Sequence, residues 1–77
     1  NPFQDEINFQ FYSSKSQTLE IKIIDAIGKT AFVTTESIQK GMMNTVVLPS
    51  LSSIQQGVYF VWIKASEQSF LRKVIKY

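Results

Sequence analysis

The sequence predicts an all-β sandwich of short strands in a single domain that spans residues 1–77. Apolar and polar residues alternate with a period of two in several short segments, and no stretch of useful length has the period of a helix. Serine, glycine and asparagine separate these segments. Because 44% of the residues are hydrophobic and 13% are aromatic, the chain has enough apolar side chains for one small core.

Two segments in the first third of the chain alternate most clearly. In EINFQFY (6–12) an isoleucine and two phenylalanines share one face, and in TLEIKIID (18–25) a leucine and two isoleucines do the same. Asp25 and Gly28 then predict a short hairpin turn, because glycine adopts positive φ without strain. TAFVTTE (30–36) is expected to be the next strand, although its pattern leaves the inward face open.

A fourth strand is expected in NTVVL (44–48), before Pro49. The loop that follows contains Leu51 and Ile54 as the expected apolar anchors. VYFVWIKA (58–65) is the segment with the highest β propensity in the chain, and it is expected to form the fifth strand.

The last two predicted strands have unusual faces. Both faces of 58–65 are apolar, so we expect Phe60 and Trp62 to form an exposed aromatic patch opposite the core face. The closing strand, SFLRKVIKY (69–77), mixes cationic and apolar residues on both faces. This pattern favours a place at the edge of a sheet, where free backbone groups can pair with another chain.

The composition removes most catalytic and metal-binding chemistry. The chain has no cysteine and no histidine, so thiolate and imidazole ligands and the usual general base are missing. The six acidic residues are expected at strand ends, in turns or on polar faces, the serines form no nucleophile elbow, and the three glycines are isolated. We therefore expect no enzyme activity, no cofactor and no metal site.

The positive charge gathers at the end of the chain. The formal net charge is +2, and residues 64–77 carry four cations against one acid, whereas 1–63 carry four lysines against five acids. Four cations on one hairpin are too few for the clustered patch that nucleic acid binding needs, so no nucleic-acid partner is expected. No apolar run approaches the ~20 residues of a membrane-spanning helix.

Four segments, taken in order, resemble a known family. They are NPF (1–3), LEIKIIDAIGK (19–29), LPSLSSIQQGVYFVWI (48–63) and RKVIKY (72–77). In order and spacing they resemble the C-terminal sorting domain of type IX secretion cargo, the type A or Por secretion tail family, over nearly all of the 77 residues. Trp62 departs from the family, which more often has a polar or charged residue there.

The resemblance implies an immunoglobulin-like antiparallel β-sandwich of six to seven strands at the C-terminus of a larger exported protein. Such cargo crosses the periplasm and reaches the cell surface or the medium. The implied partners are the type IX translocon, an outer-membrane shuttle protein and a sortase. In many members the sortase cuts near the N-terminal edge of the domain and joins the cargo to an anionic lipopolysaccharide.

The resemblance also implies a set of site residues. They are Pro2, the turn formed by Asp25 and Gly28, the segment Gly57, Val58 and Tyr59, and the final segment Lys73, Val74, Ile75 and Lys76. Gly57 is expected to serve a turn with unusual dihedral angles and Tyr59 to pack in the core. Lys73 and Lys76 are expected to be exposed cations without a packing role, which makes them candidates for recognition by a partner.

One alternative function stays open, and one assembly is expected. The domain could be an immunoglobulin-like adhesion or carbohydrate-binding module that uses Phe60 and Trp62 as a stacking platform. The isolated domain is also expected to form a strand-paired or strand-exchanged homodimer, because its last strand offers a free edge.

Overall fold

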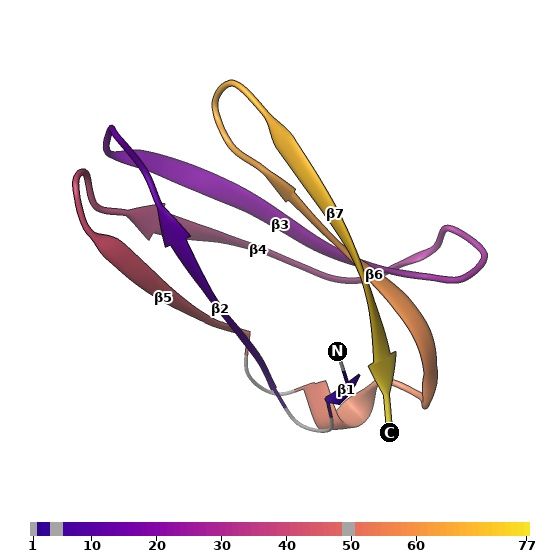
Figure 1. The fold of residues 1–77 in the computed structure, drawn as a ribbon. Helices are drawn as coiled ribbons and strands as arrows, with labels where there is room; N and C mark the ends of the chain where they lie inside the picture. The colour runs from indigo at the N-terminus through magenta and orange to yellow at the C-terminus, as the bar shows by residue number, and fades with distance from the viewer. Residues whose placement is uncertain (1, 4–5, 49–50) are drawn as a thin grey trace.

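The computed structural model describes residues 2–3, 6–48 and 51–77, and most of these residues lie in strands (Figure 1). Pro49, which was predicted to end the fourth strand, lies outside the described residues. In chain order the elements are β1 (Pro2–Phe3), β2 (Ile7–Tyr12), β3 (Gln17–Asp25), β4 (Thr30–Ile38), β5 (Met43–Leu48), the 3-10 helix η1 (Leu51–Ser53), β6 (Gly57–Lys64) and β7 (Ser69–Lys76).

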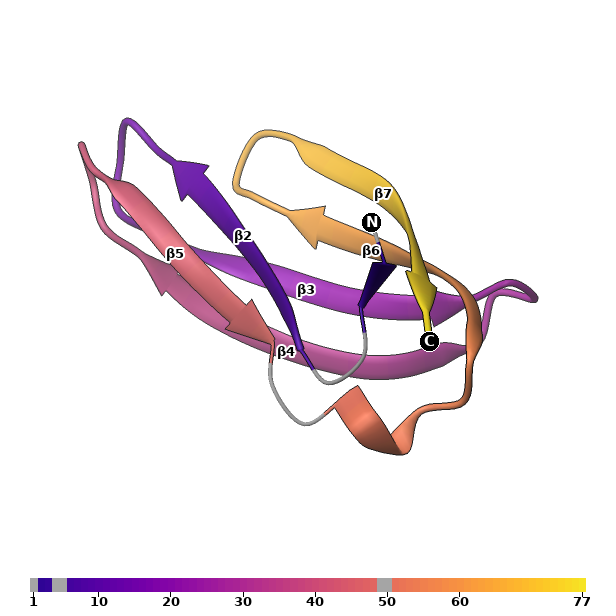
Figure 2. The same ribbon diagram turned by 60° about the horizontal axis from the view of Figure 1, so that its bottom comes forward.

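The strands form two sheets. The larger sheet has the order β1-β7-β6-β3-β4, and β2 pairs with β5 in the smaller one. The smaller sheet crosses one face of the larger sheet (Figures 1 and 2). The predicted all-β sandwich and its six strands are confirmed, with β1 as a seventh.

The strand order corresponds to that of an immunoglobulin-like sandwich. In such a fold one sheet has the order A-B-E-D and the other contains C, F and G. Here β3, β6 and β7 take the positions C, F and G, with β4 beside β3, while β2 and β5 take the positions B and E. Among the described residues no strand lies in position A beside β2 or in position D beside β5.

The core lies between the two sheets and centres on β3. Leu19, Ile21 and Ile23 are fully buried. The ladder between β3 and β6 sets Ile21 opposite Ile63 and Ile23 opposite Val61, so the two strands present one apolar surface to the smaller sheet. Full burial of an aliphatic side chain of this size stabilises the fold by roughly 1.5–3 kcal/mol. These two central strands therefore contribute much of the stability.

The inward face of β4, which the sequence pattern leaves open, is set by its pairing with β3. Phe32 lies opposite Ile23, and Ile38 lies opposite Gln17. Ile38 is buried, and Phe32 packs against the core. Since directly opposite residues in an antiparallel ladder lie on the same face, the register decides which side of β4 points inward.

The loop between β5 and β6 is anchored as predicted. Leu51 in η1 is fully buried, and the partly buried Ile54 packs against the core. The backbone N–H of Ile54 donates to the carbonyl oxygen of Leu51 at 3.3 Å. The 3-10 turn was not predicted, because three residues are too few to show a period.

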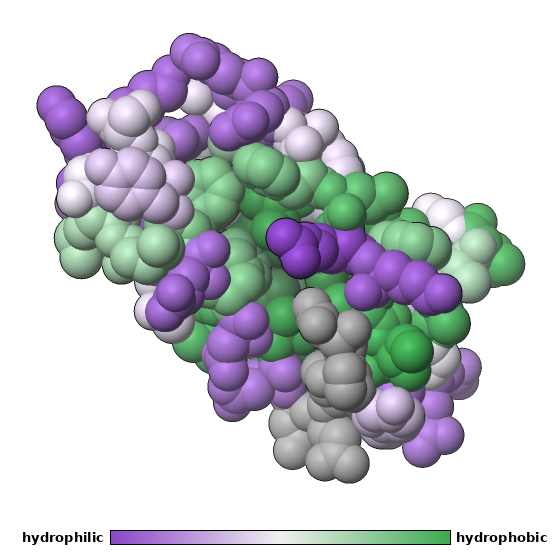
Figure 3. Space-filling model, viewed as in Figure 1, coloured by the Kyte–Doolittle hydropathy of each residue, from purple (hydrophilic) through white to green (hydrophobic). Residues whose placement is uncertain are grey.

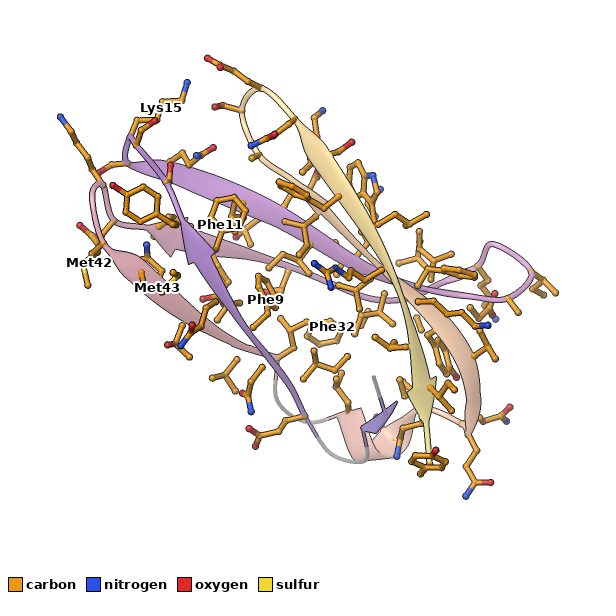
Figure 4. The ribbon with its side chains drawn as sticks, viewed as in Figure 1. Phe9, Phe11, Lys15, Phe32, Met42 and Met43 are labelled. Carbon is orange, nitrogen blue, oxygen red and sulfur yellow. The ribbon has the colours of Figure 1, made fainter. Side chains whose placement is uncertain are left out.

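The β2–β3 and β6–β7 turns meet at one end of the sandwich. Lys15 Nζ lies 3.0 Å from Glu67 Oε1, and the backbone N–H of Ser66 donates to Gln17 Oε1 at 2.8 Å. The side chain of Gln17 in turn donates to Ser13 Oγ at 2.7 Å. Figure 4 labels Lys15 at this end. These polar contacts join two turns that are far apart in the sequence.

The pairing of β1 corrects one prediction about the sheets. Pro2 lies opposite Ile75 and Phe3 opposite Lys76 in a parallel pair, so the sandwich is not antiparallel throughout. Two residues are too short to show alternation, and a parallel partner must come from a distant part of the chain. The sequence pattern therefore gives no signal for this strand.

Candidate recognition site on the last hairpin

The ladder between β6 and β7 brings together most of the residues that the sequence marked for recognition. The two segments, 57–60 and 73–76, form one block at the end of the larger sheet where β7 ends. The opposed pairs are Gly57 with Lys76, Val58 with Ile75, Tyr59 with Val74, and Phe60 with Lys73.

The turn at Asp25 and Gly28 lies beside this block, because β3 pairs with β6 and sets Asp25 opposite Tyr59. Asp25 Oδ1 accepts hydrogen bonds from the backbone N–H groups of Ile27 at 3.1 Å and Lys29 at 2.8 Å. Gly28 has a φ of 93°, which side chains of L-residues rarely adopt. The predicted hairpin turn is confirmed. The hydrogen bonds that the Asp25 carboxylate accepts from backbone groups of the turn hold the turn in its conformation.

Two residues of the block, Gly57 and Tyr59, have structural roles. Gly57 has a φ of 148°, and a Cβ placed there would meet no atom within 4 Å, so the requirement for glycine comes from the backbone and not from space. Tyr59 is buried, and its hydroxyl donates to the carbonyl oxygen of Gln55 at 2.7 Å. The expected unusual dihedral angle of Gly57 and the packing of Tyr59 are both confirmed.

Residues of β7 alternate between the two faces of the larger sheet. Val74 and Lys76 are buried, whereas Lys73 and Ile75 are exposed. The expectation that Lys76 is an exposed cation is therefore wrong, since Lys76 shares the inward face with Val74 and is only 7% exposed. Its Nζ donates to the carbonyl oxygen of Tyr77 at 3.0 Å. A long aliphatic stem allows lysine to lie in an apolar layer while its amine stays hydrogen-bonded.

Phe60 and Trp62 lie on the outer face of the larger sheet and are both half-buried. Lys22 Nζ lies 5.2 Å from the centroid of the Trp62 ring, within the ~6 Å range of a cation–π contact. Lys73 lies opposite Phe60 and Leu71 opposite Trp62 in the β6–β7 ladder. The outer face thus interleaves cations with aromatic rings and is not a bare aromatic platform.

The block therefore divides into two halves by exposure. Val58, Lys73 and Ile75 are exposed on the outer face, whereas Tyr59 and Val74 are buried. A partner can contact the exposed half directly. The buried half packs in the core and belongs to the ladder that holds β6 and β7 together.

The described part of the chain contains no cluster of three or more aspartate, glutamate, histidine or cysteine side chains that could hold a metal ion. Within residues 2–3, 6–48 and 51–77, no helix has both the length and the apolar character needed to cross a membrane.

The family to which the chain belongs follows from a comparison with protein-family models. A model described as the secretion system C-terminal sorting domain matches residues 1–77. The chain belongs to this family. Sorting domains of this kind are C-terminal signals for type IX secretion, which mark a protein for export across the outer membrane. No curated protein and no solved structure matches the chain.

One surface of the sorting domain was missed by the reasoning from sequence. It lies between β2 and β7 and contains Arg72. The residues that line it come from distant strands in different sheets, so no local pattern could have marked them. The nearest signal was the mixed face of the closing strand, where Arg72 lies between Phe70 and the buried Val74.

Proposed function

We propose that this sorting domain is a non-catalytic tail that directs a larger exported protein through the type IX secretion system. The match of the family over residues 1–77 carries the proposal. The cargo passes through the periplasm, and the translocon and an outer-membrane shuttle protein recognise the folded tail. A sortase then cuts near the N-terminal edge of the domain and joins the cargo to an anionic lipopolysaccharide at the cell surface.

The surface that the machinery contacts is the exposed half of the β6–β7 block. Lys73 supplies a cation, and the exposed side chains of Val58 and Ile75 lie on the same outer face. A charged group with an apolar surround gives a partner both orientation and buried area. Recognition by such a surface needs no catalytic group, which agrees with the lack of histidine and cysteine in the sequence.

The test uses a fluorescent passenger with a periplasmic signal peptide, fused to residues 1–77 in a strain with type IX secretion. The unchanged fusion is expected outside the cell or on its surface. Lys73→Glu is expected to leave the passenger in the periplasm, because the reversed charge repels the site that Lys73 contacts. Lys40→Glu is the matched control, since Lys40 is also exposed but lies in the β4–β5 turn.

Point variants separate recognition from folding better than a deletion does. Removal of residues 72–77 takes away Val74, which is a core residue, so lost export would also follow from unfolding. Melting curves of the purified Lys73→Glu and Lys40→Glu chains show whether both remain folded. Equal export of both folded variants would refute the role of Lys73, and retention of the unchanged fusion in the periplasm would refute the sorting function itself.

The sortase step has its own readout. A short epitope tag placed after Tyr77 is expected to be absent from passenger that has reached the cell surface, while a tag on the passenger is retained. Surface passenger that keeps both tags would show that the tail is not removed.

The carbohydrate-binding alternative depends on a ring face that a sugar can stack against. Lys22 lies over the Trp62 ring, so a sugar would have to displace it from that face. We therefore prefer the sorting function. Glycan binding by the purified chain that disappears in Trp62→Ala would reverse this preference.

A further inference from the structure

A groove of about 500 Å³ lies between β2 and β7. Figure 3 shows hydrophobic residues gathered in a hollow on this face of the molecule. The groove follows the edge of β2 that faces away from β5, which is position A of the sandwich, where the described residues place no strand. The backbone groups along such an edge have no ladder partner and can pair with an added strand.

The groove has an apolar floor, and two aromatic rings meet near one of its ends. Val61, Ile63 and Val74 form the floor. Near the β2–β3 turn the rings of Phe11 and Phe70 meet edge to face, with their centroids 5.8 Å apart, and so join β2 to β7. A strand laid along β2 would therefore turn its inward side chains onto hydrophobic residues, and burial of those side chains is favourable.

Among the described residues that line the groove, Arg72 is the one with a charged side chain. It lies on the same face of β7 as Phe70 and Val74, and its side chain is exposed. No carboxylate of the described residues forms an ion pair with it. A guanidinium beside an apolar surface pairs well with a carboxylate, through two parallel hydrogen bonds. The charge of the groove is thus complementary to that of an acidic segment.

We propose that the groove binds an extended segment of a partner protein, which adds to β2 as a strand and sets a carboxylate against Arg72. A segment as long as the six residues of β2 turns about three side chains inward, because successive side chains of a strand alternate. These side chains fill the hollow between the layers, and the backbone of the segment completes the smaller sheet.

A second copy of this chain suits the groove less well. Its β2 could offer a backbone edge, but Phe9 and Phe11 of that strand already pack against their own core. Figure 4 shows both rings turned from β2 toward the side of β6 and β7. A folded copy therefore brings no side chains that are available to fill the groove, whereas a segment without a core of its own does.

The inference deepens the proposed function, on which it rests for placing the partner segment in the secretion machinery. Peptide binding is measured on the purified chain, and export is measured in cells. Export without peptide binding would refute the peptide site in the groove and leave the sorting function standing. Peptide binding without export would refute the sorting function and leave the peptide site standing.

The experiment measures the binding of fluorescent seven-residue peptides to the 77-residue chain by anisotropy. The peptides alternate valine and threonine, and aspartate replaces each position in turn. At least one aspartate peptide is expected to bind. Arg72→Glu is expected to weaken this binding about tenfold or more, because the substitution removes the charged hydrogen-bond donor and sets a carboxylate against the aspartate. The same peptide with lysine in place of aspartate is expected to recover binding to Arg72→Glu.

Two controls make the test specific. Lys40→Glu changes the net charge equally but lies outside the groove lining, so it is expected to bind the aspartate peptide as the unchanged chain does. Peptides methylated on alternate backbone nitrogens test the strand geometry. One of the two methylated sets is expected to lose binding and the other to keep it, because the N–H groups of a strand point alternately to its two edges.

Several outcomes would overturn the proposal. They are the absence of binding by every aspartate peptide, equal loss in Arg72→Glu and Lys40→Glu, and equal binding of the two methylated sets. A dimer in sedimentation velocity that the peptides do not displace would assign the groove to a second copy and would equally overturn it.

Discussion

Replacement of Gly57 by alanine distinguishes two roles of this residue at the start of β6. One is to allow an unusual backbone conformation, and the other is to contact a partner. The φ of 148° at Gly57 lies in a region that L-residues rarely adopt, while a Cβ there meets no atom within 4 Å. The cost of Gly57→Ala is therefore a backbone cost, of about 1–3 kcal/mol for a residue held in a sparsely populated region. A less flexible unfolded chain offsets roughly 0.4–1 kcal/mol of it.

With both ranges taken at their middle, the net loss is about 1 kcal/mol, which lowers the melting temperature by roughly 4–8 °C for a domain of this size. A chain of 77 residues has a free energy of unfolding of roughly 4–12 kcal/mol, taken from ~0.05–0.15 kcal/mol per residue. Gly57→Ala is therefore expected to stay folded at growth temperature. Thermal denaturation followed by circular dichroism measures the change, and Gln56→Ala, at the exposed neighbouring position, is expected within about 0.5 kcal/mol of the unchanged chain.

The export assay then tests whether Gly57 also belongs to the surface that a partner contacts. If Gly57 serves only the backbone, the folded Gly57→Ala fusion is exported like the unchanged one. A melting temperature equal to that of the unchanged chain would refute the backbone argument. Lost export by a chain that is still folded would instead make Gly57 part of the contacted surface.

Three further predictions concern what holds the sandwich together. Ile21→Ala is expected to destabilise the fold by about 2–5 kcal/mol, because Ile21 is fully buried, whereas Thr18→Ala on the exposed side of β3 is expected to cost less than about 0.5 kcal/mol. Urea unfolding followed by the single tryptophan measures both, and equal effects would contradict the assigned inner face. Tyr59→Phe removes one hydrogen bond and is expected to cost about 1 kcal/mol in the same assay; an unchanged midpoint would argue against that bond. The exposed pair of Lys15 and Glu67 is expected to show a coupling below about 1 kcal/mol in a double-mutant cycle, and a coupling that does not fall with salt would contradict its surface character.

The strands and turns of this protein could be predicted from its sequence because their signals are local. Alternation over 6–12 and 18–25 places strands there, since side chains of a strand point alternately to its two faces. Asp25 and Gly28 mark a turn, because the aspartate oxygen binds nearby backbone groups and glycine adopts positive φ. The family resemblance also comes from the order of short segments, which needs no structure.

The burial of Lys76 shows what local reasoning cannot supply. In the sequence, Lys73 and Lys76 are two similar cations near the end of one strand. Only the pairing of β7 with β6 decides that Val74 and Lys76 face the core and that Lys73 faces outward. The register of a ladder is a relation between distant segments, and a shift of one residue would exchange the two faces.

By itself, the sequence determined the class of the fold, the six longer strands, the hairpin turn at Asp25 and Gly28, and the family. The tertiary structure decided which of the marked residues a partner can reach, through the register of β6 and β7, and where a partner strand could add. The groove at Arg72 exists because β2 and β7 belong to different sheets and meet across the core. Such a surface depends on how layers pack, and packing between distant strands leaves no periodic signal in the chain.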